Sequence, residues 1–240
     1  MTGAILNAAG IVAGGLFGLA RRTPLSPQVQ AFFKLALGLA TVFYGLRLTW
    51  LSVNGPFLLI LKQIGIALLA IMLGKLTGRL LHFQKASNHA GQYARKLIEQ
   101  TRPDDPQRFS NGLNACSILF CASPLGLLGA VHDGLVGYVY PLAIKGVMDG
   151  LAMMTFVKLF RWGGMLAALP VFVLQGSLTL VCAIYLEPFL RTHGLVDSVN
   201  AVGGLIVCTV GLVIFEVRKV ELADFLPSLA VAPLLAWLWR

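Results

Sequence analysis

Long, nearly continuous runs of apolar residues alternate with short polar connections along most of this 240-residue chain. Each run is close to the roughly 20 residues that an α-helix needs to cross a hydrocarbon core of about 30 Å. The runs lack the period-two alternation of membrane β-barrel strands. We therefore expect eight helical spans, at 3–20, 31–52, 57–80, 110–130, 141–160, 164–186, 198–217 and 222–239.

The only long polar stretch, residues 82–108, separates three expected spans from five. Within it, the run QYARKLIEQ places Tyr93, Leu97 and Ile98 on one side of a short helix, which we expect at the membrane interface. We interpret 82–108 as a cytoplasmic connecting segment. Because the other connections are short, residues 1–240 are expected to form a single integral-membrane domain of the all-α class, a polytopic membrane helix bundle.

Composition and charge agree with this prediction. Hydrophobic residues make up 57% of the chain and charged residues only 12%, which is unusual for a soluble domain. An N-terminus outside the membrane places fourteen of the nineteen Lys and Arg residues on the cytoplasmic side, as the positive-inside rule predicts. These are Arg21, Arg22, Lys34, Lys75, Arg79, Lys85, Arg95, Lys96, Arg102, Arg108, Lys158, Arg161, Arg218 and Lys219. The net charge of +9 therefore requires no nucleic-acid partner.

Glycines spaced at helical intervals define two faces suited to close helix packing. Gly10, Gly14 and Gly18 form one face on the first span, and Gly204 and Gly211 form another on the seventh. Such faces let a second backbone approach closely. They predict packing either within the bundle or between subunits of a homo-oligomer.

Two short internal matches suggest repeats of different kinds. The second span from Gly38 and the seventh span from Gly204 share the pattern G-L-x5-G-L and should run in opposite directions, as in an inverted repeat. A competing match, between Asn7-Ala-Ala-Gly10 and Asn200-Ala-Val-Gly203, would be parallel. Both asparagines are expected near the outer surface, where water can solvate them.

Asp149 is the clearest ionisable residue within an expected span. If Pro141 opens the fifth helix, Asp149 lies about 12 Å below the outer surface. Lys145 lies one turn away on the same face, where an i,i+4 ion pair neutralises both charges. Charged groups at such depth usually face a partner or a water-filled cavity. The pair can therefore be structural, line a pathway, or do both.

Further polar side chains are expected near this pair. Gln175 lies near the middle of the sixth span, which Pro170 is expected to kink. The fourth span carries Asn114 and is interrupted at Ser123, which precedes a proline. Transporters often hold ions and small solutes at discontinuous helices. These spans therefore form the candidate substrate or ion path, and hydrogen bonding between helices is the alternative role for each side chain.

Asp133 follows His132 at the expected outer end of the fourth span. A turn at the Asp-Gly step is the favoured interpretation, and a proton-accepting His-Asp pair is the alternative. We include Asp133 in the candidate path. The chain contains neither a metal-ligand spacing nor a catalytic motif, so we expect no metal, no cofactor and no enzymatic activity.

Four stretches carry a resemblance to a known family. They are GAILNAAGIVAGGLFGL from Gly3, SILFCASPLGLLGAVHDGL from Ser117, IKGVMDGL from Ile144 and PVFVLQGSLTL from Pro170. Over essentially its whole length, the chain resembles bacterial inner-membrane proteins of the domain-of-unknown-function 554 family. The resemblance implies a multi-pass protein of the bacterial cytoplasmic membrane. Its signature residues here are Cys121, Gly129, Asp133, Gly134, Lys145, Asp149, Gly150, Gln175 and Gly176.

Two functional hypotheses follow. In the first, the protein is a small secondary transporter or channel for a small solute or ion, and proton or cation binding to Asp149 changes the accessibility of the path. In the second, it is a non-transporting membrane scaffold or regulatory subunit that packs against a partner through its glycine-rich faces. The expected partners are the lipid bilayer, a small solute or ion, and a second copy of the chain.

Overall fold

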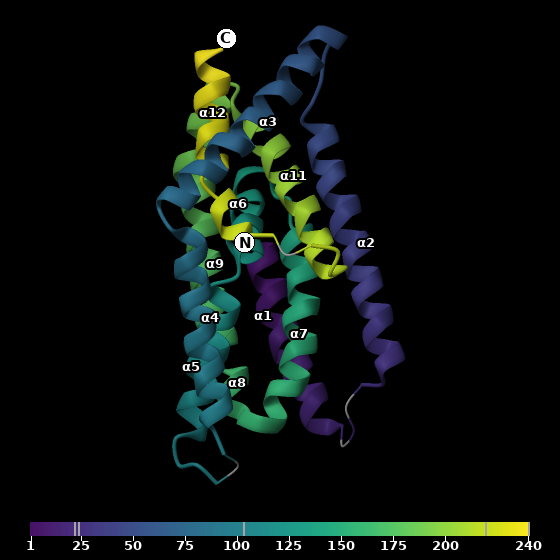
Figure 1. The fold of residues 1–240 in the computed structure, drawn as a ribbon, viewed down its shortest axis with the longest axis vertical. Coiled ribbons are helices and arrows are strands. Elements are labelled where there is room, and N and C mark those ends of the chain that lie inside the picture. Colours follow the sequence, from purple (N-terminus) through teal and green to yellow (C-terminus); the bar gives the residue numbers. More distant parts are fainter. Residues whose placement is uncertain (22, 24, 103, 219, 240) are drawn as a thin grey trace.

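A computed structural model describes residues 1–21, 23, 25–102, 104–218 and 220–239, which form a long helical bundle (Figure 1). No strand occurs in these ranges, which confirms the all-α class. Arg22 and Lys219, which enter the charge count above, lie outside the described residues.

Among the residues that the structure describes, five helical stretches are long and apolar enough to cross a membrane. They are α1 (Thr2–Ala20), α2 (Pro27–Leu51), α3 (Phe57–Leu80), the stretch Trp162–Thr192, and α11 (Val196–Ile214). The first three match the expected spans to within a few residues. The stretch Trp162–Thr192 comprises α8 (Trp162–Met165), α9 (Ala168–Val181), the π-helical η1 (Cys182–Leu186) and α10 (Glu187–Thr192).

The other expected spans have less regular counterparts. The fourth is a pair of helices, α5 (Arg108–Cys121) and α6 (Pro124–Val136), bent by 60°, which gives a sixth candidate span when the pair is counted as one. The fifth is α7 (Tyr140–Phe160), and the eighth comprises the 3-10 helix η2 (Leu222–Phe225) and α12 (Ser228–Leu238). The number of eight spans therefore stays a prediction.

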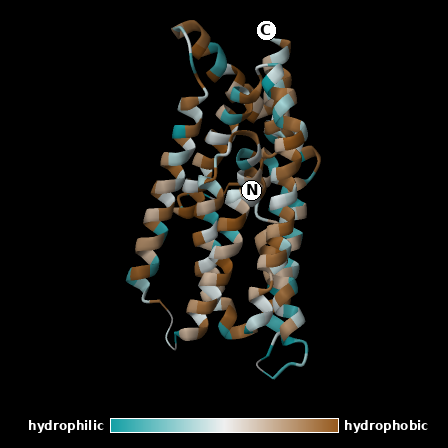
Figure 2. Ribbon diagram, turned by 180° about the vertical axis from the view of Figure 1, so that it is seen from behind, coloured by the Kyte–Doolittle hydropathy of each residue, from teal (hydrophilic) through white to brown (hydrophobic). Residues whose placement is uncertain are grey.

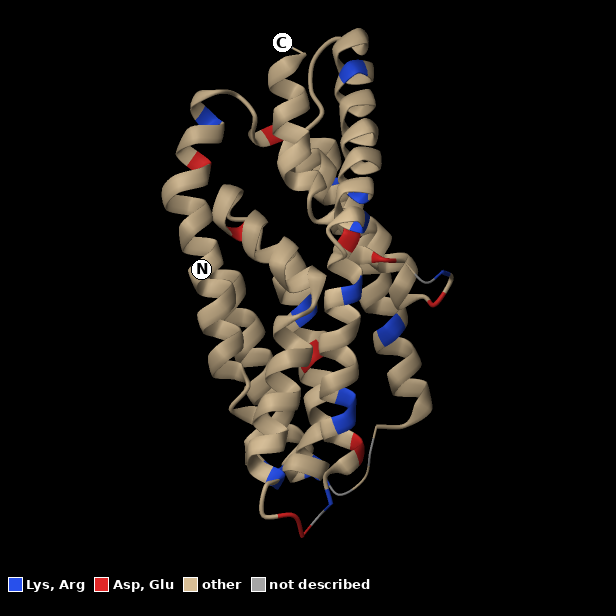
Figure 3. Cartoon of the chain, turned by 60° about the vertical axis from the view of Figure 1, so that its left-hand side comes forward, with Lys and Arg blue, Asp and Glu red and all other residues tan. Residues whose placement is uncertain are grey.

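Apolar residues recur along all the long helices (Figure 2), and many large apolar side chains are exposed on the outside of the bundle. Trp50, Phe57 and Leu58 are each more than 70% exposed. Charged residues are sparse along the helices (Figure 3). An apolar outer surface of this extent is suited to contact with lipid rather than water.

Helices α1 and α7 form the first close pair and run side by side in the lower half of Figure 1. Gly10 faces Gly146 and Gly14 faces Gly150, so the two helices are parallel. A Cβ atom added at Gly14 would lie 2.5 Å from the Cα atom of Gly150, closer than carbon atoms can approach. Gly18 continues the contact against Met154.

Helices α2 and α11 form the second close pair, and they are antiparallel. Gly45 lies against Gly204, while Gly211 lies against Gly38 and Val42. The pattern G-L-x5-G-L thus falls on two helices that contact each other in the expected opposite directions. Both glycine faces are used within the chain, which confirms in-bundle packing. The inverted repeat and the homo-oligomer stay predictions.

The segment 82–108 contains one long helix, α4 (Phe83–Gln100), which lies beside α5 in Figure 1. Ala94 is fully buried, and Leu97 and Ile98 pack on the same core cluster. Tyr93 is 51% exposed and does not share that face. Leu97 and Ile98 therefore lie on one apolar side of the helix, as expected, and this side packs against the protein core.

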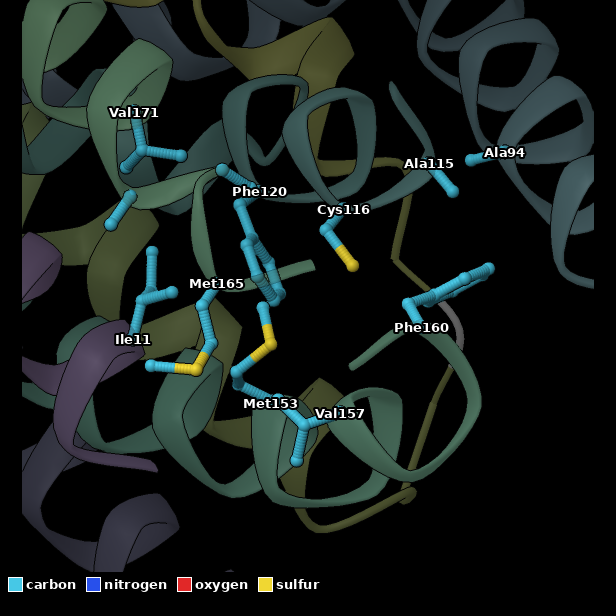
Figure 4. Close-up of a cluster of buried hydrophobic side chains, with 12 residues drawn as sticks. Ile11, Ala94, Ala115, Cys116, Phe120, Met153, Val157, Phe160, Met165 and Val171 are labelled. Carbon is cyan, nitrogen blue, oxygen red and sulfur yellow. The ribbon is translucent and has the colours of Figure 1, made fainter. Parts of the chain in front are cut away.

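The core beneath α4 and α5 joins helices that are distant in the sequence (Figure 4). Ile11 of α1, Phe120 of α5, Met153 of α7 and Met165 of α8 belong to one buried cluster. This cluster fixes α1, α5 and α7 relative to one another at the depth where α5 ends. It thereby positions the break between α5 and α6.

Candidate functional site

The site is built around the break between α5 and α6. Helix α5 ends at Cys121, and α6 begins at Pro124 after the change of direction. Proline has no N–H group and its ring clashes with the preceding turn, so a helix can begin at Pro124 but does not continue through it undisturbed. The expected interruption at Ser123 is confirmed. The first turn of α6, including Gly126, consequently lies against side chains from α7 and α9.

Lys145 and Asp149 form an ion pair one turn apart on α7. Their side chains are 2% and 11% exposed, so the expected i,i+4 pair is present and almost completely buried. The Lys145 ammonium nitrogen also lies 5.6 Å from the centre of the Phe120 ring, within range of a cation–π interaction. Each charge stabilises the other, because a single buried charge without a counter-charge is strongly destabilising.

Gln175 of α9 and Asn7 of α1 complete the polar cluster. The Nδ2 group of Asn7 donates a hydrogen bond of 2.9 Å to Oε1 of Gln175, and both residues are buried. Within the described part of the chain, Gln175 Nε2 and Asn7 Oδ1 have no hydrogen-bond partner. A Cβ added at Gly126 would lie 2.8 Å from both Gln175 Nε2 and Lys145 Cε, so the amide and the lysine flank the same turn of α6. An unpaired donor and an unpaired acceptor thus lie near a buried ion pair.

A cavity of about 790 Å³ reaches the Lys145–Asp149 pair, whereas Gln175 and Asn7 are not among its described lining residues. Ser123, Lys145 and Asp149 line its inner end, and Arg21 and Lys158 line it where α1 and α7 end. From Lys145 to Lys158 the cavity follows α7 for about 20 Å. Its intervening walls are largely apolar and include Leu37, Met148, Leu151, Val210 and Val213. The volume lies in the range of small-molecule sites in proteins.

Comparison with known proteins identifies the family of the chain. The family model described as "Protein of unknown function (DUF554)" matches residues 2–237. The chain belongs to this family. Its relatives include the uncharacterized protein YqgA of Escherichia coli (strain K12), 27% identical over 238 residues that cover 99% of this chain and 97% of YqgA. Another is the uncharacterized membrane protein YdfK of Bacillus subtilis (strain 168), 27% identical over 233 residues that cover 97% of this chain and 94% of YdfK.

No solved structure matches this member of the DUF554 family. YdfK is named as a membrane protein, which agrees with the five long apolar helices in the described residues of this chain. We conclude that this DUF554 protein is a helical membrane protein. Its family supplies no activity, so the site must be interpreted from its own geometry.

Asp133 of this DUF554 protein does not line the cavity. It lies within α6, which continues to Val136, and the chain turns only at Gly137, where φ is +66°. The carboxylate Oδ2 of Asp133 accepts a hydrogen bond of 3.0 Å from the backbone N–H of Gly3 and so caps the first turn of α1. His132 beside it is fully buried. The expected turn at this pair is therefore wrong, because the bend before α6 directs both residues into the bundle.

Two other details of the candidate path differ from expectation. Asn114 is exposed on α5 and is not among the cavity-lining residues, because α5 buries the face that carries Gly112, Ala115 and Cys116. The kink expected at Pro170 is also wrong. Helix α9 begins at Ala168, so Pro170 lies in the first turn, where its missing N–H group removes no hydrogen bond within the helix.

Asn7 is a functional candidate whose burial was not expected from the sequence. It was expected near the outer surface and is fully buried, and Asn200 is likewise only 4% exposed. A signal for Asn7 was present, since Gly3, Asn7, Gly10 and Gly14 recur at intervals of four, three and four residues. This spacing places Asn7 on the helix face that packs against α7.

Metal binding finds no support in the described residues. They contain no group of three or more His, Cys, Asp or Glu side chains placed to hold a metal ion. The four cysteines are free, and Cys116 packs in the core shown in Figure 4.

Proposed function

We propose that this protein is a small secondary transporter or channel of the bacterial cytoplasmic membrane, with its N-terminus outside, and that its solute or ion passes Asp149. The cavity that ends at the Lys145–Asp149 pair is the observation that carries this proposal. Voids and buried charges both lower stability unless they are compensated. A bundle that served only to pack its helices would have no use for both at one place.

The arrangement of helices suits a movement that changes the access of a solute to Asp149. The cavity is lined from one side by α1 and α7 and from the other by α2 and α11, which are the two pairs held by glycine contacts. Movement of one pair relative to the other changes the width of the cavity without breaking either close contact. Binding of a proton or cation to Asp149 weakens its attraction to Lys145 and favours such a movement.

Solute flux into proteoliposomes tests the proposal. Vesicles containing the purified full-length protein are exposed to glycerol, glycine, sodium acetate or methylammonium chloride, and their swelling is followed by light scattering. We expect faster swelling than in empty vesicles for at least one solute, and loss of this difference in Asp149→Asn. Unchanged flux in Asp149→Asn, or no flux for any solute, would contradict the proposal.

Glu99→Gln is the matched control for this experiment. Glu99 also belongs to an i,i+4 pair, with Arg95, but that pair is exposed on α4 and does not line the cavity. The substitution makes the same chemical change from carboxylate to amide. We expect flux in Glu99→Gln to equal that of the unmodified protein.

The scaffold hypothesis receives less support from the glycine faces. Gly10, Gly14 and Gly18 pack against α7, and Gly204 and Gly211 pack against α2. A partner protein would have to displace a helix of the chain itself to use these contacts. We therefore place transport first.

A further inference from the structure

The ion pair at the inner end of the cavity limits which ligands can bind there. Lys145 and Asp149 are each the counter-charge of the other. A ligand with one charge that separates them satisfies one member and leaves the other buried without a counter-charge, which is unfavourable. A zwitterion that enters between them supplies a counter-charge to both.

The two amide atoms that lack a hydrogen-bond partner resemble the ion pair, because one is a donor and the other is an acceptor. Gln175 Nε2 is a donor, which suits a carboxylate, and it flanks the same turn of α6 as the Lys145 side chain. Asn7 Oδ1 is an acceptor, which suits an ammonium group. Gln175 and Asn7 are 1% and 0% exposed, so bulk water does not satisfy these atoms. Gln175 and Asn7 do not line the cavity, so a ligand with both groups would pair the two charges, and the amides would set the polarity around them.

The first turn of α6 adds to the carboxylate side of the site. A helix N-terminus carries about half a positive charge from its aligned peptide dipoles, and it favours anionic groups. Ser123, Pro124 and Leu125 line the cavity, so this end of α6 borders the space that the ligand would enter. Lys145 can follow a ligand because its four-carbon stem is flexible.

We propose that the cavity binds a small zwitterion, an α-amino acid with an apolar side chain, whose carboxylate lies at Lys145 and whose ammonium lies at Asp149. Apolar cavity walls such as Met148, Leu151 and Val210 would receive the side chain. The inference names the solute class of the proposed function, but binding itself does not require that transport occurs.

Binding of a matched set of probes to the purified full-length protein tests this inference. The probes are leucine, 4-methylpentanoate, which lacks the ammonium group, and 3-methylbutylamine, which lacks the carboxylate. We expect leucine to bind, and each of the other probes to bind at least about tenfold more weakly, because each leaves one buried charge unpaired. The cavity carries more basic than acidic side chains among its described lining residues, which by itself favours an anion. Binding of 4-methylpentanoate as tight as that of leucine would therefore overturn the inference, as would absence of leucine binding.

Variants of the pair and of the amide provide the second test. Asp149→Asn should shift the preference from leucine toward 4-methylpentanoate, and Lys145→Gln should shift it toward 3-methylbutylamine. Because either single variant can fail to fold, the neutral double variant Lys145→Gln/Asp149→Asn is measured as well, and it should lose leucine binding. Gln175→Glu places a second carboxylate near Lys145, where it competes with the ligand carboxylate and should weaken leucine binding at least about tenfold. Leucine affinity unchanged in both the double variant and Gln175→Glu would overturn the inference.

The results separate the two proposals. Leucine is added to the solutes of the flux experiment. Leucine binding without flux of any solute, leucine included, would contradict transport and support the ligand class. Flux that depends on Asp149, together with absence of leucine binding, would support transport and overturn the ligand class.

Discussion

The contact between α1 and α7 gives a stability prediction that can be worked out from the structure. In Gly14→Ala, the new Cβ would lie 2.5 Å from the Cα atom of Gly150, whereas carbon atoms pack at about 3.5–4.0 Å. The two helices must therefore separate by about 1 Å, which also loosens the contact at Gly10. Strain of this kind typically costs about 1–3 kcal/mol. Gly65→Ala on α3 is the control, because an added Cβ there meets nothing within 4 Å and alanine favours a helix by about 0.5–1 kcal/mol.

Unfolding of both variants in detergent micelles, titrated with sodium dodecyl sulfate, measures this difference. We expect the free energy of unfolding to fall by about 1–3 kcal/mol in Gly14→Ala and to stay equal or rise in Gly65→Ala. If Gly14→Ala is as stable as Gly65→Ala, α1 and α7 are not in the direct backbone contact described here.

Two further stability predictions follow from buried charges. Asp149→Asn or Lys145→Gln alone should lower the free energy of unfolding by about 3–5 kcal/mol, whereas the double variant should lie within about 1 kcal/mol of the unmodified protein; equal losses in all three would contradict the ion pair. Asp133→Ala removes the acceptor for the Gly3 N–H group and should cost about 0.5–2 kcal/mol, with faster amide hydrogen exchange confined to the first turn of α1. Unchanged exchange in that turn would show that Asp133 does not cap α1.

The helices that the sequence predicts well are those that depend on composition alone. Helices α1, α2 and α3 match the expected spans closely because long apolar runs and short polar connections decide where they begin and end. The region 110–130 could not be placed as one helix, since Pro124 starts a new helix whose direction depends on the packing of α5 and α7. The 60° bend is a property of that packing.

The same distinction applies to the site. The Lys145–Asp149 pair is local, because residues four apart share a helix face, and it was predictable. The contact between Asn7 and Gln175 joins residues 168 positions apart, so no local pattern contains it. Asn114 was misplaced for a related reason: its position along a helix could be predicted, but the rotation of α5 about its own axis could not.

Access of water to the inner end of the cavity is the most direct test of the central claim. Ser123→Cys and Ser117→Cys are made in a chain whose four native cysteines are replaced by alanine, and each is treated with a charged, membrane-impermeant methanethiosulfonate. Ser123 lines the cavity, whereas the hydroxyl of Ser117 is buried on α5 and Ser117 is not among the lining residues. We expect rapid modification of Ser123→Cys and none of Ser117→Cys. Equal protection of both cysteines would contradict an aqueous path to the Lys145–Asp149 pair.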